Sequence, residues 1–203
     1  MKDFESDRIS KYLYLINEHD KPTHEKGDDI YELVDEIEKI RSIEKIVKNE
    51  YLGKNLDPNW AEVGIHYEDP YMYVLRDAIV FQKKHAKIHH RVCWKNGRVS
   101  GVVMLTRFKE KIVFVKHFRH AIQKYSLELP RGGIEKDLSI SDIIYQEIKD
   151  EVGGEISKIS ELPEIHLCNS LLNTFIAVYE IELKSFNKPE KKEGISEILL
   201  LNY

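Results

Sequence analysis

The spacing of apolar residues changes partway along the chain, and this change limits the folds that the chain can adopt. Up to about Pro58 the apolar residues recur at steps of three and four, which is the period of one helix face. They are Ile30, Leu33, Val34, Ile37, Ile40, Ile43 and Val47, and an earlier group of the same kind contains Tyr12, Leu13, Leu15 and Ile16. This spacing predicts two helices in the first part of the chain.

From Tyr71 onward the apolar residues gather in short runs that are rich in valine and isoleucine, as in strands. The expected strands lie at 73–75, 78–81, 87–94, 101–106, 112–116, 164–167, 175–183 and 195–201. Asn96 and Gly97 stand between two of these runs and form the strongest hairpin signal in the sequence. Because these strands surround one expected helix, the pattern indicates an α+β sandwich.

The expected helix between the strands covers about residues 141–152 and has recognisable ends. Ser139 is followed three residues later by Asp142, which is a capping-box pattern. Gly153 and Gly154 follow the last apolar residue and suit a left-handed C-terminal cap. The start and the end of this helix can therefore be predicted from local chemistry alone.

The composition excludes several functional classes. The 203 residues carry a formal net charge of −4 without a single basic block, which argues against general nucleic-acid binding. No apolar run approaches the roughly 20 residues that span a bilayer, and the first residues lack the apolar centre of a signal peptide. Cys93 and Cys168 stand far apart, as expected in a reducing compartment. We therefore expect a cytoplasmic protein that binds neither nucleic acid nor membrane.

Three carboxylates recur at helical spacing near the end of the expected helix. Glu147, Asp150 and Glu151 stand at positions i, i+3 and i+4, so an α-helix presents all three on one face. Like charges at this spacing repel each other, and the negative end of the helix dipole lies nearby. A divalent cation such as Mg²⁺ would relieve both penalties. The alternative is a solvated acidic face on which Lys149 softens the repulsion.

A glycine-containing loop precedes this helix. Residues 127–135 read Leu-Glu-Leu-Pro-Arg-Gly-Gly-Ile-Glu. Glycines allow a backbone to approach a phosphate or a metal closely, although such loops are also ordinary turns. A strand, this loop and then a helix with three aligned carboxylates form a more specific combination than any one of the three parts.

This combination resembles the Nudix hydrolases and, among them, the ADP-ribose and nucleoside-diphosphate-sugar pyrophosphatases. From Gly132 the family's box aligns without a gap: Glu147 falls on the glutamate of its Arg-Glu pair, Asp150 and Glu151 on its Glu-Glu pair, and Gly153 on its last glycine. Residues 115–120 and 125–133 are similar to the Arg-His and Glu-Leu-Pro-x-Gly-Gly patterns of that branch. The resemblance covers about residues 71–201 and does not extend to the N-terminal helices.

Two positions depart from the box. Leu138 stands where the family has its first glutamate, and Gln146 stands where the family has arginine. In the family these two residues tend to form an ion pair, so losing both leaves no unpaired charge. Farther on, Asn-Ser-Leu-Leu-Asn-Thr at residues 169–174 replaces the Pro-Ser-Pro-Gly segment of many ADP-ribose enzymes, which leaves the substrate open.

The resemblance implies a Nudix α/β/α sandwich with a mixed sheet over residues 66–203, whose residues 66–100 form a small antiparallel sheet. A helical extension over residues 1–65 would precede it. The family also implies Mg²⁺ or Mn²⁺ as the cofactor, a small-molecule nucleotide as the substrate and a homodimer as the assembly. The implied metal ligands are the Arg131 carbonyl, Glu147, Asp150 and Glu151, the implied catalytic residues are Glu147, Glu151 and Glu193, and the implied substrate-binding residues are Arg119, Glu128, Gly132 and Gly133.

Some of these residues have ordinary alternatives. Arg119 suits a phosphate through its planar fork, but it could equally form a salt bridge at a strand edge. Glu193 and Glu197 are the candidate general bases, yet acids beside the lysines of residues 188–192 are often only solvated.

Histidines and tryptophans offer weaker candidates. His85, His89 and His90 lie on an expected strand whose alternation separates His90 from the other two, which is poor zinc geometry. We expect these histidines on a surface strand, and we expect Trp60 and Trp94 to pack in a core rather than stack on a base.

A second hypothesis is a non-catalytic Nudix-like module that senses a nucleotide or binds a protein. The replaced pair at Leu138 and Gln146 favours this module, as do the additional N-terminal helices. The retained carboxylates Glu147, Asp150 and Glu151 favour the magnesium-dependent pyrophosphatase. Fold alone does not decide between the two.

Overall fold

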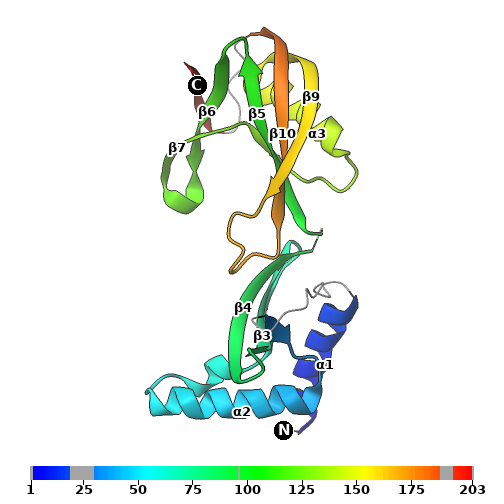
Figure 1. Ribbon diagram of the computed structural model, residues 1–203, viewed down its shortest axis with the longest axis vertical. Coiled ribbons are helices and arrows are strands. Elements are labelled where there is room, and N and C mark those ends of the chain that lie inside the picture. The colour runs from blue at the N-terminus through cyan, green and yellow to red at the C-terminus, as the bar shows by residue number, and fades with distance from the viewer. Residues whose placement is uncertain (1, 19–29, 96, 188–193, 203) are drawn as a thin grey trace. The chain divides into compact units, whose positions relative to one another are not determined.

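The computed structural model of the chain describes residues 2–18, 30–95, 97–187 and 194–202. The chain folds as two units (Figure 1). The first unit comprises Met1–Lys95 and Ser170–Asn173, and the second comprises Asn96–Asn169 and Thr174–Tyr203. The boundary that we expected, between residues 65 and 66, lies inside a strand of the first unit.

The first unit combines two helices with a four-stranded antiparallel sheet. Its elements are α1 (Lys2–Glu18), β1 (Tyr31–Leu33), α2 (Ile37–Gly53), the 3-10 turn η1 (Pro58–Ala61), β2 (Gly64–Glu68), β3 (Met72–Phe81) and β4 (His85–Trp94). Strand β3 is central: β1 and β2 pair with successive parts of one edge, and β4 pairs with the whole of the other edge. The segment Ser170–Asn173 adds to this sheet, since the Leu171 carbonyl accepts a hydrogen bond from the Val92 amide at 2.8 Å.

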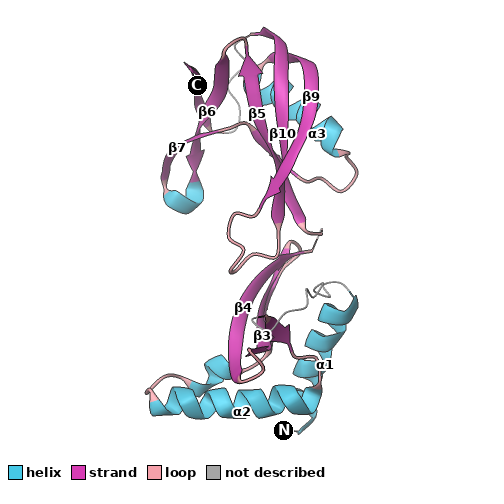
Figure 2. Ribbon diagram, viewed as in Figure 1, coloured by secondary structure: helices cyan, strands magenta, loops and turns pink. Residues whose placement is uncertain are grey.

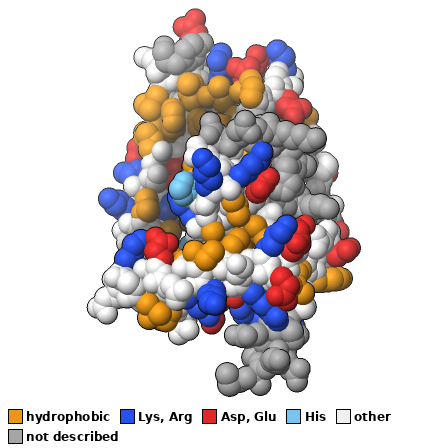
Figure 3. All heavy atoms as spheres, turned by 60° about the horizontal axis from the view of Figure 1, so that its bottom comes forward, with side chains coloured by type: hydrophobic (Ala, Val, Ile, Leu, Met, Phe, Trp, Pro, Cys, Tyr) orange, Lys and Arg blue, Asp and Glu red, His pale blue; other side chains and the backbone are white. Residues whose placement is uncertain are grey.

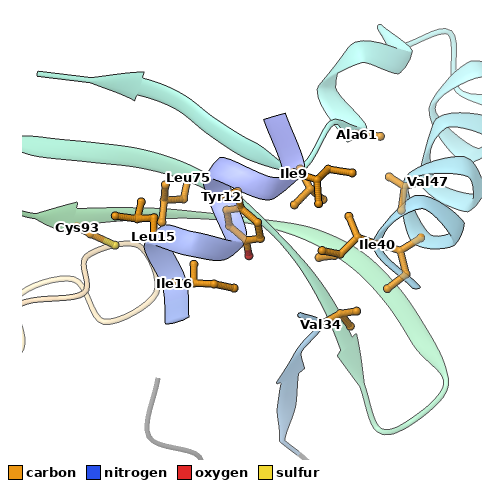
Figure 4. Close-up of a cluster of buried hydrophobic side chains, with 13 residues drawn as sticks. Ile9, Tyr12, Leu15, Ile16, Val34, Ile40, Val47, Ala61, Leu75 and Cys93 are labelled. Atoms are coloured by element: carbon orange, nitrogen blue, oxygen red, sulfur yellow. The ribbon is translucent and has the colours of Figure 1, made fainter. Parts of the chain in front are cut away.

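The core of the first unit lies between its helices and its sheet. Ile9 and Tyr12 of α1 point toward Ile40 and Val47 of α2 and toward Leu75 of β3 (Figure 4). All five side chains are at most 2% exposed, so α1 and α2 are held mainly by this apolar contact. The hydroxyl of Tyr12 also donates a hydrogen bond to the Asp77 carboxylate at 2.7 Å, which links α1 to β3.

The helix that we expected from Ile30 onward begins later than predicted. Residues Tyr31–Leu33 form β1, where Leu33 lies opposite Ile79, and α2 begins at Ile37. The Val34 amide donates to the Ala78 carbonyl at 2.9 Å. The prediction was wrong at these residues because a strand more than forty positions away supplies their hydrogen bonds, and no local pattern reports that partner.

The second unit contains a seven-stranded sheet. Its strands are β5 (Val99–Phe108), β6 (Lys111–Arg119), β7 (Lys124–Glu128), β8 (Arg131–Gly133), β9 (Gly154–Ile165), β10 (Phe175–Phe186) and β11 (Ile195–Asn202). The order β11-β6-β5-β10-β9 forms the main path, with β7 beside β6 and β8 beside β5. Strands β5 and β10 run parallel and the other pairs are antiparallel, so the sheet is mixed, as the predicted α+β fold requires (Figure 2).

One α-helix, α3 (Ile140–Glu147), packs on this sheet among the described residues of the second unit. Ser139 and Asp142 form the capping box that the sequence predicts, with the Asp142 amide donating to Ser139 Oγ at 3.1 Å. Ile143 and Ile144 are buried in the second core, against apolar residues of β5, β6 and β10. Leu138 also packs against this core, which explains an apolar side chain at that position.

The hairpin expected at residues 96 and 97 is wrong. Asn96 itself lies outside the described residues, but β4 and β5 on either side of it belong to different sheets. Gly97 has a positive φ of 100°, which suits glycine, but it lies between strands of two different sheets.

Several surface features bear on the classes that the composition excluded. Within the described residues, each helix is too short or too polar for a membrane crossing. On the face drawn in Figure 3, lysine and arginine side chains lie beside aspartate and glutamate side chains.

Trp60 and Trp94 are 49% and 39% exposed, so their expected burial in a core is wrong.

Candidate functional site

Strand β8 brings the glycine-containing segment against helix α3. Gly132 is buried and lies opposite Val102 of β5. A Cβ added to Gly132 would lie 2.7 Å from both Glu147 Cγ and Ile143 Cγ2, which no real side chain tolerates. The absence of a side chain at Gly132 therefore lets the carboxylate of Glu147 lie directly against the backbone of β8.

Gly101 contributes to the same close approach and was not singled out by the sequence analysis. A Cβ at Gly101 of β5 would lie 2.8 Å from the carbonyl oxygen of Gly132. A glycine inside a strand that is otherwise rich in valine is a signal for such an approach, and it could have identified this position.

The end of the helix is wider than an α-helix. Residues Ile148–Val152 form a π-helical turn (η3), in which the Gly153 amide donates to the Ile148 carbonyl at 2.9 Å. In a π-helical turn, whose hydrogen bonds join residues i and i+5, each residue is rotated about 80° around the axis from the one before it. In an α-helix this rotation is about 100°. Gly153 then ends the turn in the left-handed conformation, as predicted.

This wider turn changes the grouping of the three carboxylates. Over four residues it keeps Glu151 within about 40° of Glu147, but over three residues it rotates Asp150 roughly 120° from Glu147. The expectation of three carboxylates on one face assumed a uniform α-helix, which the structure does not have here, and the described residues contain no close group of three such side chains. Glu147 and Glu151 remain together beside β8.

Glu151 is held in a place that disfavours its charge. Its Oε2 accepts a hydrogen bond from the Arg131 amide at 3.3 Å, which fixes the carboxylate beside β8. Burial, and then the negative charge of Glu147, raise the pKa of Glu151 from 4.5 to about 7. The charges of Arg119 and Arg131 act in the opposite direction but do not offset this rise. The two glutamates thus form a half-buried pair that a cation would stabilise.

Two arginines converge on Glu128 at the edge of this pair. Arg119 Nε lies 3.1 Å from both carboxylate oxygens of Glu128, and Arg119 Nη2 donates to Oε2 at 2.7 Å. Arg131 Nε lies 3.1 Å from the same Oε2. Burial alone would raise the pKa of Glu128, but the hydrogen bonds of Arg119 and the charge of Arg131 outweigh it and lower the pKa. The salt bridge considered for Arg119 is therefore present, and it lies next to the glutamate pair.

The carboxylates fit a cation that a substrate helps to hold. In the described part of the chain, no three or more His, Cys, Asp and Glu side chains are grouped closely enough to hold a metal ion by themselves. Mg²⁺ commonly takes one or two protein carboxylates and completes its shell with phosphate oxygens and water. Glu147 and Glu151 match that arrangement better than a cage made by the protein alone.

The remaining predicted residues lie in different places. Gly133 is exposed on β8, and Glu193 lies outside the described residues. Glu197 is exposed on β11 and pairs with Lys116 at 3.8 Å, which is the arrangement of a surface ion pair. Its role as a general base stays a prediction.

Among the described residues, the histidines of β4 belong to no group that could hold a metal ion. His85, His89 and His90 are all exposed on β4, as expected for a surface strand. Cys93 is buried in the first core and Cys168 is exposed, and no disulfide joins them.

The fold and the site define an α+β protein in which a helix presents two carboxylates to a glycine strand of a mixed sheet. Its fold is similar to that of a solved structure, the crystal structure of an ADP compounds hydrolase. The TM-score is 0.56 and the identity 13%, over 70% of this chain and 76% of that chain. At this identity the similarity shows the fold alone. No family model matches the chain, and no curated protein matches it.

Proposed function

We propose that this chain hydrolyses a nucleoside diphosphate that is linked to another moiety, with ADP-ribose or a nucleotide sugar as the substrate class. The reaction adds water across the phosphoanhydride bond and yields a nucleoside monophosphate and a sugar phosphate. The cofactor is Mg²⁺ or Mn²⁺. The similarity of fold to an ADP compounds hydrolase and the resemblance of residues 132–153 to the Nudix box support this proposal.

One observation carries the proposal: two glutamates are held together where their charges are unfavourable. Glu147 and Glu151 lie against adjacent backbone positions of β8, and the pKa of Glu151 is raised to about 7 by burial and by Glu147. The raised pKa means that the charged form of Glu151 is disfavoured in the absence of a cation, so the pair is better explained by function.

The residues of the chain would divide the work as follows. Glu147 and Glu151 would hold the cation, which when bound polarises the diphosphate and lowers the pKa of a water. Arg119 and Arg131 would direct their guanidinium groups toward the phosphate oxygens while Glu128 keeps both in place. The water oxygen would bond to phosphorus as the bridging P–O bond breaks, the leaving phosphate would carry away the bond's electron pair, and the water would release a proton to solvent.

The proposal is tested by assaying a panel of nucleotide sugars, ADP-ribose included, with Mg²⁺ and with Mn²⁺. Wild type is expected to release a nucleoside monophosphate, and Glu151→Gln is expected to reduce turnover by about 100-fold or more, because one of two charged ligands is lost. Glu155→Gln is the matched control: Glu155 lies four residues farther on and is 62% exposed in a surface pair with Lys184. Its turnover should equal that of wild type.

A second measurement separates catalysis from binding. Mg²⁺ together with a nucleotide should raise the melting temperature of wild type and of Glu155→Gln, but not that of Glu151→Gln. Binding without turnover by wild type would favour the non-catalytic sensor over the hydrolase. The absence of both binding and turnover across the panel would refute both. The homodimer implied by the family is a separate proposal, which sedimentation velocity of the full chain would test.

A further inference from the structure

Arg76 occupies the middle of the sheet in the first unit. It lies opposite Gly64 of β2 on one side and opposite His90 of β4 on the other. Directly opposed residues of antiparallel strands share a face, so Arg76 and His90 point to the same side. Gly64 offers no side chain there, which leaves the position beside Arg76 open to another element.

Arg8 of α1 fills the position that a side chain at Gly64 would take. A Cβ at Gly64 would lie 3.1 Å from Arg8 Cγ and 3.6 Å from Arg8 Nη1. Gly64 also has a φ of 147°, a conformation that other residues rarely adopt. The backbone of β2 is thus shaped so that a second guanidinium group lies next to the strand position of Arg76.

Two histidines complete the group. His66 is exposed on β2, where its Nε2 donates to the main-chain oxygen of Glu62 at 2.8 Å, and His90 is exposed on β4. Burial is the largest cause that lowers the pKa of each, and the charge of Arg76 lowers both further. Arg8 also lowers the pKa of His66. Both arginines are therefore close enough to His66 for their charges to lower its pKa.

The two arginines are incompletely satisfied. Arg8 Nη2 donates to Glu44 at 3.0 Å, but Arg8 Nη1 is buried without an acceptor among the described residues. Arg76 Nη1 donates to the Asn59 carbonyl at 3.0 Å, whereas its buried Nε has no acceptor in the same part of the chain. Buried donors of this kind call for an acceptor.

We propose that Arg76, Arg8 and His90, beside His66, form an anion-binding site in the first unit that takes a phosphate group. The two guanidinium groups and the His90 ring offer N–H donors from several directions, which suits the oxygens of a tetrahedral phosphate better than a planar carboxylate. The phosphate comes from inorganic phosphate or from a nucleoside monophosphate. The site uses no residue of the proposed hydrolase site and is independent of that function.

The test is a titration of the full-length chain, without magnesium, with inorganic phosphate and separately with AMP. The readout is the NMR resonance of the Arg76 Nε–H group, with calorimetry for the affinity. Arg76→Gln is expected to weaken phosphate binding at least about tenfold, since charge-assisted hydrogen bonds are lost. Arg41→Gln is the matched control, because Arg41 carries the same charge in the same unit but is 43% exposed and paired with Glu38.

The outcomes separate a built site from general attraction. Loss of binding in Arg76→Gln with full binding in Arg41→Gln supports the site, and the tighter of the two probes identifies the source of the phosphate. An equal loss in both variants, or an Arg76 resonance that neither probe shifts, overturns it. If Arg76→Gln does not fold, His90→Gln replaces it, since His90 is exposed; its binding should weaken severalfold, and unchanged binding overturns the site.

Discussion

At the scale of single residues, the second unit places like charges together instead of dispersing them. Glu147 and Glu151 meet beside β8, and the nearest compensating charges, Arg119 and Arg131, are both engaged by Glu128. The positive charges therefore reduce the repulsion between the glutamates without removing it. This arrangement makes the stability of the unit sensitive to the protonation of one side chain, Glu151.

The sign of that sensitivity follows from the raised pKa. Because the pKa of Glu151 rises from 4.5 in the unfolded chain to about 7, the folded chain binds the proton more tightly. The contribution of Glu151 to the stability of the folded chain is fully present below about pH 4.5 and is lost as the pH rises through about 7. Allowing for partial access of solvent, wild type should lose about 2 kcal/mol from this group between about pH 4 and about pH 8.

Urea unfolding over this pH range, without divalent cations, measures the effect. Glu151→Gln should remove most of the loss and should be more stable than wild type at about pH 8. Glu155→Gln should follow the wild-type curve, because its carboxylate is exposed. Parallel curves for wild type and Glu151→Gln would show that the glutamate pair is not strained.

Much of this site could be predicted from the sequence, because its parts are local. The spacing of Glu147 and Glu151 and the glycines before the helix indicated a charged site beside a close backbone approach. The separation of Asp150 from that pair could not be predicted, since residue spacing does not reveal a π-helical turn. The contact of both Arg119 and Arg131 with Glu128 could not be predicted either, because it depends on the pairing of β6 with β7 and of β5 with β8.

At the scale of secondary-structure elements, local signals were reliable where the backbone satisfies its own hydrogen bonds. The capping box at Ser139 and the left-handed cap at Gly153 are confirmed for this reason. Local signals failed where a distant strand supplies the partner. Leu33 lies in β1 and pairs with β3 instead of forming part of α2. Gly97 lies between strands of two different sheets instead of between two paired strands. A helix needs only its neighbours in sequence, whereas a strand needs another segment.

The packing of β8 against α3 yields a prediction about elements. Gly132→Ala should destabilise the chain by about 1–3 kcal/mol, because its Cβ would meet Glu147 and Ile143 at 2.7 Å. Gly133→Ala is the matched control, since a Cβ at Gly133 meets nothing within 4 Å. Urea unfolding of both variants measures the difference. Similar midpoints for the two would mean that β8 does not approach α3 as closely as described.

At the scale of the whole molecule, each unit has its own apolar core. The first core takes its buried side chains from α1, α2, η1 and the antiparallel sheet, and the second takes its own from α3, η3 and the mixed sheet. Ile40 and Ile144 are completely buried in the first and second core, respectively. The phosphate site that we infer belongs to the first unit and the glutamate pair to the second, so each site depends on a different core.

This division predicts where a core substitution acts. Ile40→Ala and Ile144→Ala should each destabilise the chain by about 2–4 kcal/mol, since each leaves a cavity. Hydrogen exchange read by mass spectrometry should quicken in α1, α2 and β3 for Ile40→Ala, and in α3, β5 and β10 for Ile144→Ala. Only Ile144→Ala should also weaken stabilisation by magnesium and nucleotide, because only that core supports the helix that carries Glu147. If either variant quickened exchange equally in both sets of elements, the two cores would open as one cooperative unit, and both sites would then depend on both.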